Sequence, residues 1–284
     1  MSRNPVGSND RHAVRSHDEN FPVLFRLLDR ARREDLAAIY AFCRRTDDLG
    51  DEAAGDRLEL LDRWEADVRS AIVDATGPPH LRGLARAARR RSLGTDPFVR
   101  LIEANRIDQR RNRWERHDEL LGYCEHSATP VGRLVLGVLG CDDRERRALS
   151  DATCIGLQLV NFWQDIGEDL RDRGRIYLPA ENMRRFGVVE NDLAQPVANE
   201  RVRALVRVEV ERARDYLDRG APLARRVGPR ARLDIACFTA GGRALCDEIA
   251  AQSYDTLARR PAPGRHGRAH IVLRTLLQLV RGRG

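Results

Sequence analysis

Two aspartates stand four residues apart in an acidic segment, residues 46–52. On a helix, Asp47 and Asp51 lie on the same face, where two like charges repel each other. A hard divalent cation bound by both carboxylates would remove that repulsion. A solvated acidic helix end, with Gly50 loosening its last turn, explains the segment equally well, so this motif alone does not decide.

A second set of oxygen-bearing side chains recurs at Asn161, Asp165 and Asp169. The spacing of four and four places them on one stripe over two helical turns. The residues around them are strongly apolar, and unpaired carboxylates are costly in such surroundings. Arginines of a neighbouring helix would pair with them in a purely structural role. A stripe made only of oxygen ligands, an amide among them, favours Mg²⁺ instead.

The two motifs together are more specific than either alone, because Mg²⁺ is usually held by one or two carboxylates and by phosphate oxygens of a substrate. Two acidic helices that face each other across a bundle would hold several Mg²⁺ ions, and a diphosphate would bridge them. Guanidinium groups bind phosphate oxygens in a bidentate manner. We therefore predict that Arg44, beside the first motif, and Arg175, after the second, bind the diphosphate.

The composition narrows the class of protein. The chain has 284 residues, of which 42% are hydrophobic and 33% charged, and its formal net charge is +7. These values fit a soluble globular protein. Arginines are spread along the chain and mixed with acids, which argues against nucleic acid as a partner. Six cysteines without a CxxC pair indicate reduced thiols and predict a cytoplasmic protein.

Helical periodicity recurs along the chain without strand-like alternation, so we predict an all-α fold. Short breaks rich in Gly and Pro separate the helices, and none resembles a domain linker. We expect a flexible tail over residues 1–16 and a single domain over 17–284. Pro130 falls inside one helical pattern and should kink it. The predicted helices span residues 34–52, 56–74, 80–91, 97–113, 117–139, 143–170, 199–220, 230–258 and 268–280.

The last predicted helix is amphipathic and has arginines at both ends. Two interpretations stay open for its apolar face. It packs onto the bundle, or it rests on an anionic membrane surface, which would make the protein peripheral to the inner face of the membrane.

The motifs, taken together, resemble one known family, the head-to-head isoprenyl diphosphate synthases that include squalene and phytoene synthases. The resemblance runs from about residue 17 to about residue 261. Its landmarks are AIYAFCR at 38–44 leading into the first acidic motif, YCEHSATPVG at 123–132, QLVNFWQDIGED at 158–169 and GRIYLP at 174–179.

This resemblance implies a fold and a set of site residues. The fold is the class I isoprenoid synthase helical bundle around a central cavity, and the substrate is an isoprenoid diphosphate. The resemblance implies that Mg²⁺ is held by Asp47, Asp51, Asn161, Asp165 and Asp169, the four aspartates being the catalytic set. It places His17, Arg44, Gln158 and Arg175 near the diphosphate, Tyr177 in the substrate site, and Phe21 and Tyr40 along the prenyl pocket.

Three departures from phytoene-type members point to a subgroup. Residues 19–23 replace a serine-rich run, Gln164 stands where an arginine is common, and Gly242 stands where those members have a tyrosine. All three resemble the hydroxysqualene synthases of the hopanoid pathway, known as HpnC. That subgroup implies Mg²⁺-dependent ionisation of presqualene diphosphate and capture by water to give hydroxysqualene, a lyase reaction, with functional coupling to other hopanoid-pathway enzymes.

Two other functions remain as alternatives. One is a prenyltransferase that condenses two prenyl diphosphates to presqualene diphosphate, squalene or phytoene. The other is a non-catalytic relative that keeps the bundle as a lipid-binding or assembly module. Such a relative should have lost acidic ligands, whereas both motifs are complete here.

Overall fold

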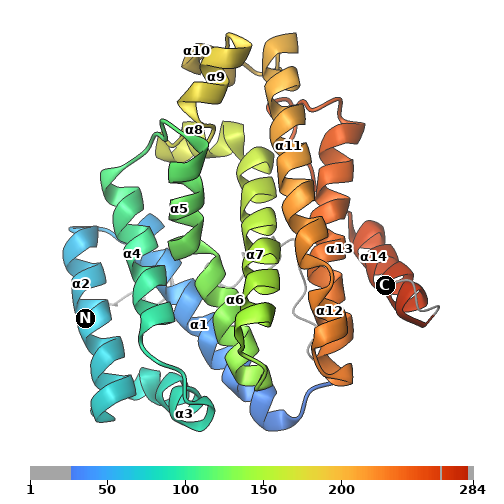
Figure 1. The fold of residues 1–284 in the computed structure, drawn as a ribbon. Coiled ribbons are helices and arrows are strands. Elements are labelled where there is room, and N and C mark those ends of the chain that lie inside the picture. The colour runs from blue at the N-terminus through green and yellow to red at the C-terminus, as the bar shows by residue number, and fades with distance from the viewer. Residues whose placement is uncertain (1–26, 263, 281–284) are drawn as a thin grey trace, which may run out of the picture.

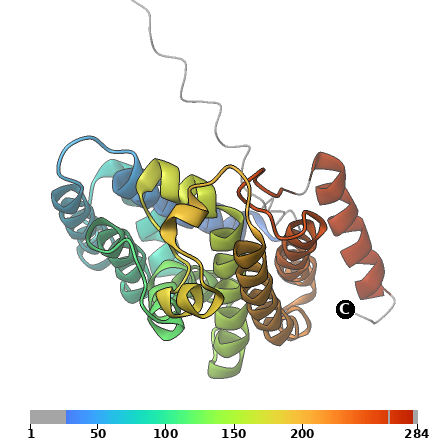
Figure 2. The ribbon, with the colours of Figure 1, turned by 90° about the horizontal axis from the view of Figure 1, so that it is seen from above.

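A computed structural model describes residues 27–262 and 264–280, and over these residues the protein consists of helices and connecting turns without a strand. The long helices run roughly along one direction as a bundle (Figures 1 and 2). The predicted all-α fold is confirmed. The α-helices are α1 Arg30–Asp51, α2 Arg57–Arg69, α3 Arg82–Arg91, α4 Asp96–Arg110, α5 His117–Ser127, α6 Thr129–Leu139, α7 Arg144–Gln164, α8 Ile166–Arg173, α9 Ala180–Phe186, α10 Glu190–Leu193, α11 Glu200–Gly220, α12 Leu223–Arg226, α13 Pro229–Ala251 and α14 Arg265–Val280.

Side-chain caps fix where the long helices begin. The carboxylate of Asp29 accepts a hydrogen bond from the backbone N–H of Arg32 at the start of α1, and Asp143 accepts one from Arg146 at the start of α7. Asn199 caps α11 in the same way. Each cap satisfies a backbone donor that has no partner inside its helix, which typically contributes about 1 kcal/mol.

The predicted helix over 117–139 is two helices. α5 ends at Ser127 and α6 begins at Thr129, with Pro130 in its first turn. Proline lacks the backbone N–H that a continuous helix needs, so a helix accommodates it only in the first turn. The predicted kink at Pro130 is therefore confirmed as a break at Ala128.

The predicted helix over 143–170 is also interrupted, and the interruption falls on a site residue. α7 ends at Gln164 and α8 begins at Ile166, with Asp165 between them at φ −106° and ψ 13°. The prediction of one unbroken helix is wrong here. The backbone ladder continues across the break, because Asp165 N donates to Asn161 O at 3.0 Å and Asp169 N donates to Asp165 O at 2.8 Å. The three predicted ligands therefore keep their helical spacing.

Two hydrophobic clusters form the core. One is built mainly on α5, α7 and α11 and includes Trp163, which has no exposed surface. The other lies among α1, α2, α4 and α6 and includes Phe42 and Phe98. α7 and α11 come unusually close because Gly156 has no side chain: a Cβ there would lie 2.9 Å from the backbone N of Leu217.

Other differences concern helix ends and short helices. The predicted helix over 230–258 ends at Ala251, followed by turns, and α9, α10 and α12 were not predicted. The 56–74 segment is α2 followed by a π-helix, η1, over Ser70–Asp74. Within the residues that the structure describes, no helix is both long and apolar enough to cross a membrane. The tail over 1–16 and the single domain over 17–284 remain predictions.

Candidate functional site

One pocket collects most of the residues predicted from the two acidic motifs. It has a volume of about 280 Å³ and lies among α1, α4, α5, α7, α8 and the segment after α8. Its lining is mostly polar. The lining residues are Asp47, Asp51, Leu101, Ala104, Asn105, Asp108, Tyr123, Ser127, Gln158, Asn161, Phe162, Asp165, Asp169, Arg173, Arg175 and Tyr177.

The sequence-predicted residues divide into three groups. All five predicted ligands line the pocket, and so do the predicted substrate residues Gln158, Arg175 and Tyr177. Arg44 and Tyr40 are not among the lining residues. Arg44 instead pairs with Asp48 at 3.3 Å and Tyr40 is 42% exposed. His17 and Phe21 lie outside the described residues.

A glycine brings the first motif against α4. Gly50 is buried on α1 between the two aspartates, and a Cβ there would lie 1.9 Å from Oδ1 of Asn105 on α4. Across this contact Asn105 Nδ2 donates to Asp47 Oδ1 at 3.4 Å, and Gln109 Nε2 donates to Gly50 O at 2.9 Å. Gly50 thus permits the close approach that orients Asp47, rather than merely loosening a helix end.

Arginines pair with three of the four motif aspartates. Arg175 Nη1 donates to Asp51 Oδ1 at 2.9 Å, and Arg173 lies 3.4 Å from Asp169. Arg260, after α13, donates from Nε to Asp165 Oδ1 at 2.6 Å and from Nη2 to Oδ2 at 3.1 Å. Among the described residues, arginines therefore serve as counter-ions for three of the predicted ligands, as expected of a purely structural role, but not for Asp47.

Burial raises the pKa of three carboxyl groups of the motifs, those of Asp47, Asp165 and Asp169. Burial, and after it the negative charge of Asp165, raises the pKa of Asp169 from 3.8 to about 7. The pKa of Asp47 rises to about 6 because protein surrounds it, even though its side chain is open to the pocket. Nearby negative charge opposes ionisation at both positions. A cation placed between the motifs would favour their ionised forms.

Asp108 is a site residue that the sequence reasoning missed. Tyr123 Oη donates to its Oδ2 at 2.6 Å, Tyr177 Oη donates to its Oδ1 at 3.1 Å, and Arg175 lies 3.6 Å away. Burial raises the pKa of Asp108 to about 6. Its position on the predicted 97–113 helix, three residues after Asn105, is the only signal that the sequence offers.

An aromatic wall closes one side of the pocket. The rings of Phe162 and Tyr177 stack with centroids 3.9 Å apart, and Tyr123 stacks on Tyr177 at 5.8 Å. Trp163, the next residue, points away: it is fully buried and its Nε1 donates to the backbone O of Glu209 at 3.0 Å. Of the two neighbouring aromatics, only Phe162 lines the pocket.

The donor set fits a hard cation that is shared with a ligand. Oδ1 of Asn161 is buried without a hydrogen-bond partner although it belongs to a pocket-lining residue, and an orphaned buried acceptor is rare. Among the described residues, no three His, Cys, Asp or Glu side chains gather closely enough to form a complete metal site. Mg²⁺ typically binds one or two protein carboxylates and completes its coordination shell with water and phosphate oxygens. A site with few protein ligands is therefore compatible with Mg²⁺.

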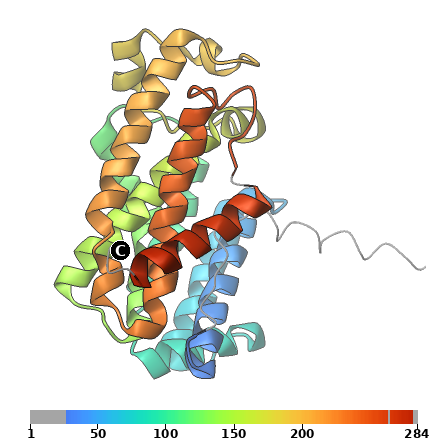
Figure 3. The ribbon, with the colours of Figure 1, turned by 90° about the vertical axis from the view of Figure 1, so that its right-hand side faces the viewer.

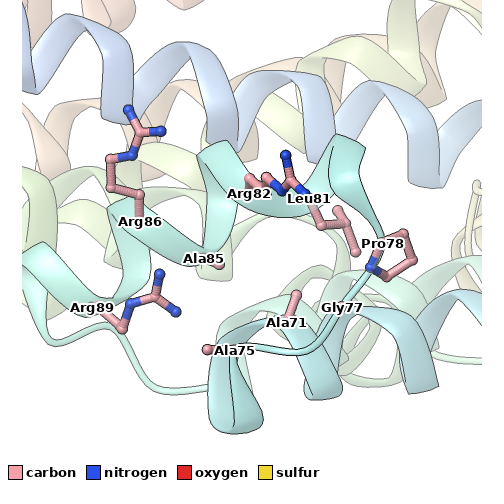
Figure 4. A pocket seen from close by; sticks show the side chains of 9 residues that line it. All are labelled: Ala71, Ala75, Gly77, Pro78, Leu81, Arg82, Ala85, Arg86 and Arg89. Atoms are coloured by element: carbon pink, nitrogen blue, oxygen red, sulfur yellow. The ribbon is translucent and has the colours of Figure 1, made fainter.

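A second cavity, of about 210 Å³, lies between η1 and α3 (Figure 4). It contains none of the motif residues and no carboxylate. Its lining residues are Ala71, Ala75, Gly77, Pro78, Leu81, Arg82, Ala85, Arg86 and Arg89. This second cavity therefore offers no carboxylate ligands and is not an alternative location for the predicted cation site.

Comparison with known proteins assigns the family. Residues 14–274 match the family model for squalene/phytoene synthase. The chain belongs to the squalene/phytoene synthase family. Its members act on prenyl diphosphates, and family enzymes with such substrates generally use divalent metal ions. The resemblance inferred from the motifs and the class I isoprenoid synthase bundle are both confirmed.

The similar proteins include phytoene synthases and a squalene synthase. The 15-cis-phytoene synthase of Synechococcus elongatus is 33% identical over 248 residues, which cover 82% of this chain and 80% of the relative. The structure of squalene synthase HpnC from Alicyclobacillus acidocaldarius is 43% identical, with a TM-score of 0.79, and the match covers 84% of this chain and 91% of that one. A dehydrosqualene synthase structure, 24% identical with a TM-score of 0.83, shares the fold.

Two positions where the chain departs from phytoene-type members have structural explanations. Gln164 does not line the pocket but is buried, with its Nε2 bonded to the backbone O of Pro261 and its Oε1 accepting from Arg260. At Gly242 a Cβ would lie 2.8 Å from Leu217 and 2.9 Å from Leu157, so α13 has no room for a tyrosine there. The third departure, at residues 19–23, lies outside the described residues.

Proposed function

We propose that this family member is a hydroxysqualene synthase: it ionises presqualene diphosphate with the help of Mg²⁺ and lets water capture the carbocation. The observation that carries the proposal is the single pocket that joins both oxygen-rich motifs to Arg173 and Arg175. The 43% identity to the squalene synthase HpnC supports the subgroup. We also propose that the protein is cytoplasmic and that it works with other enzymes of the hopanoid pathway.

Asp47, Asp51, Asn161, Asp165 and Asp169 would hold the Mg²⁺ ions, and the diphosphate oxygens would complete their shells. Bound Mg²⁺ supplies Lewis-acid neutralisation of the leaving diphosphate. The unpartnered Oδ1 of Asn161 and the raised pKa of Asp169 support this assignment, because both features are relieved by a nearby cation.

Arginines at the same end of the pocket would stabilise the departing diphosphate. Arg175 is 7% exposed and is held by Asp51 and Asp108, so its guanidinium is fixed before substrate arrives. Preorganised positive charge stabilises developing negative charge more than mobile charge does. Arg173, between Asp51 and Asp169, is a second such group.

The aromatic wall would protect the carbocation that remains. Loss of diphosphate leaves a cyclopropylcarbinyl cation, which rearranges and opens. Water then adds to the cation, and loss of one proton from the added water gives the alcohol. The face of Phe162 stabilises positive charge and, with Tyr177, excludes water from one side. The cavity of about 280 Å³ is at the small end of ligand pockets, so it suits the diphosphate end of the substrate.

The decisive experiment is product analysis. The purified protein is incubated with presqualene diphosphate and Mg²⁺ without NADPH, and the extract is analysed for hydroxysqualene. We expect hydroxysqualene together with diphosphate. If the enzyme instead leaves presqualene diphosphate unchanged and turns over farnesyl diphosphate alone to presqualene diphosphate or squalene, the proposed subgroup is wrong.

Condensation of two prenyl diphosphates, a prenyltransferase reaction, is the second candidate. The observation that favours it is the group of phytoene synthases among the relatives, including that of Arthrospira platensis at 32% identity over 88% of this chain. The same assay with farnesyl or geranylgeranyl diphosphate separates the two candidates.

A further inference from the structure

The C-terminal end of the chain is rich in arginine and lacks acidic residues. Residues 259–284 contain seven arginines and no aspartate or glutamate, which equals the formal net charge of +7 for the whole protein. The preceding 258 residues are therefore neutral overall. Arg260 pairs with Asp165 outside this segment, and the other six arginines have no acid within it.

α14 packs on α13 along one side and lies at the outside of the bundle (Figures 1 and 3). Thr275 marks the packed side, because it is only 4% exposed. Leu273, Leu276 and Leu277 are 56%, 43% and 45% exposed. Their spacing of three and four places them on one face of the helix, opposite Thr275.

The leucines form a solvent-exposed apolar stripe, and the arginines nearby have no acids within their segment. This combination is typical of a helix that rests in a lipid interface. Leucines enter the boundary of headgroups and acyl chains, and arginines bind anionic headgroups at the same depth. Arg274, exposed between Leu273 and Thr275, is placed for such a contact. We propose that the outer face of α14, formed by Leu273, Leu276 and Leu277, docks on an anionic membrane surface.

Charge argues against two other occupants of this face. A second copy of the chain would bring two arginine-rich segments without acids of their own into contact, and these segments repel each other. The protein's own residues 1–26 carry four arginines and three acids, so they offer no net negative charge. An anionic lipid surface is complementary both to the arginines and to the leucines.

The test measures co-sedimentation of the full chain with vesicles of phosphatidylcholine alone or with about one third phosphatidylglycerol. We expect binding to the anionic vesicles, weakened by salt. Replacing all three leucines by Gln should lower the partition coefficient about tenfold or more, through lost apolar burial. Arg274→Gln should lower it about fivefold, which corresponds to ~1 kcal/mol for one arginine at an anionic surface.

Two matched variants control for general surface changes. Val73→Gln removes an apolar side chain that is 69% exposed, far along the chain from α14, and Arg89→Gln removes an exposed arginine of α3. Both should bind vesicles as the unmodified protein does. Equal losses in the controls and in the α14 variants would overturn the proposal.

A tryptophan reporter keeps the proposal testable even if the triple variant folds poorly. Trp64, Trp114 and Trp163 are at most 5% exposed, so a new Trp at position 277 dominates any change in emission. With Leu277→Trp we expect a blue shift on anionic vesicles and none on neutral ones. No shift, or a triple variant that binds vesicles normally but melts lower or changes oligomeric state, would show that protein covers this face and would overturn the proposal.

These vesicle measurements need no substrate. Their failure would leave the proposed reaction untouched, and failure of the product assay would leave the docking surface untouched.

Discussion

The contact between α1 and α4 at Gly50 provides a sharp test of how the first acidic motif is positioned. In the variant Gly50→Ala the new methyl group would start 1.9 Å from Asn105 Oδ1 and 2.8 Å from its Cγ, against the 3.4 Å or more of an ordinary contact. The two helices or the Asn105 side chain must therefore move by more than 1 Å. The hydrogen bonds from Asn105 to Asp47 and from Gln109 to Gly50 O cross this contact.

The displacement should affect stability and turnover to different extents. Overpacking of this kind costs about 1–3 kcal/mol of unfolding free energy. Displacing a catalytic group by about 1 Å costs on the order of a hundredfold in rate. We expect kcat to fall by about that factor while the protein stays folded at assay temperature, as measured by urea unfolding and by turnover with Mg²⁺.

Gly122→Ala is the matched control, because Gly122 lies in the interior of α5 and a Cβ there would meet no atom within 4 Å. Replacing an unhindered helical glycine by alanine usually stabilises a protein by about 1 kcal/mol. We expect this variant to be slightly more stable and fully active. Wild-type turnover in Gly50→Ala would refute the claim that close helix packing positions Asp47.

Three further predictions concern single side chains. Asp47→Ala and Asp165→Ala should each abolish turnover and leave the helix content unchanged in circular dichroism; a variant with substantial activity would remove that aspartate from the catalytic set. Burial raises the pKa of Glu209 above 4.5, so its contribution to stability is present below pH 4.5 and is lost as the pH rises through the folded-state pKa. Urea unfolding should therefore show that Glu209→Gln gains stability relative to wild type as the pH rises from low values to pH 8, and a difference independent of pH would contradict this. Gly242→Tyr should lower the unfolding free energy by several kcal/mol, since a Cβ there already lies 2.8 Å from Leu217; an unchanged melting temperature would count against this packing.

Local spacing in the sequence was enough to predict the all-α fold and the side chains of the two motifs. Asp47 and Asp51, one helical turn apart, line the same pocket as predicted from their positions. The stripe of Asn161, Asp165 and Asp169 was also predicted, although its helix is interrupted at Asp165. Spacing determines which residues share a face, but helix ends also depend on tertiary contacts that spacing does not contain.

Contacts between distant segments could not be predicted from the sequence. Arg260 reaches Asp165 across 95 positions, and Asp108 receives hydrogen bonds from Tyr123 and Tyr177. In a chain so rich in arginine, no local pattern distinguishes Arg260 from its neighbours. Arg44 shows the reverse: its place beside the first motif suggested a diphosphate ligand, but in the structure it pairs with Asp48.

The most direct test of the central claim is calorimetric titration with a non-hydrolysable presqualene diphosphate analogue, with Mg²⁺ and with EDTA. We expect tight binding only with Mg²⁺. The affinity should fall at least tenfold in Asp47→Asn and in Asp165→Asn, which corresponds to ~1.4 kcal/mol for each motif. Equal affinity in EDTA, or an effect from one motif alone, would contradict the claim that both motifs together grip cations around the diphosphate.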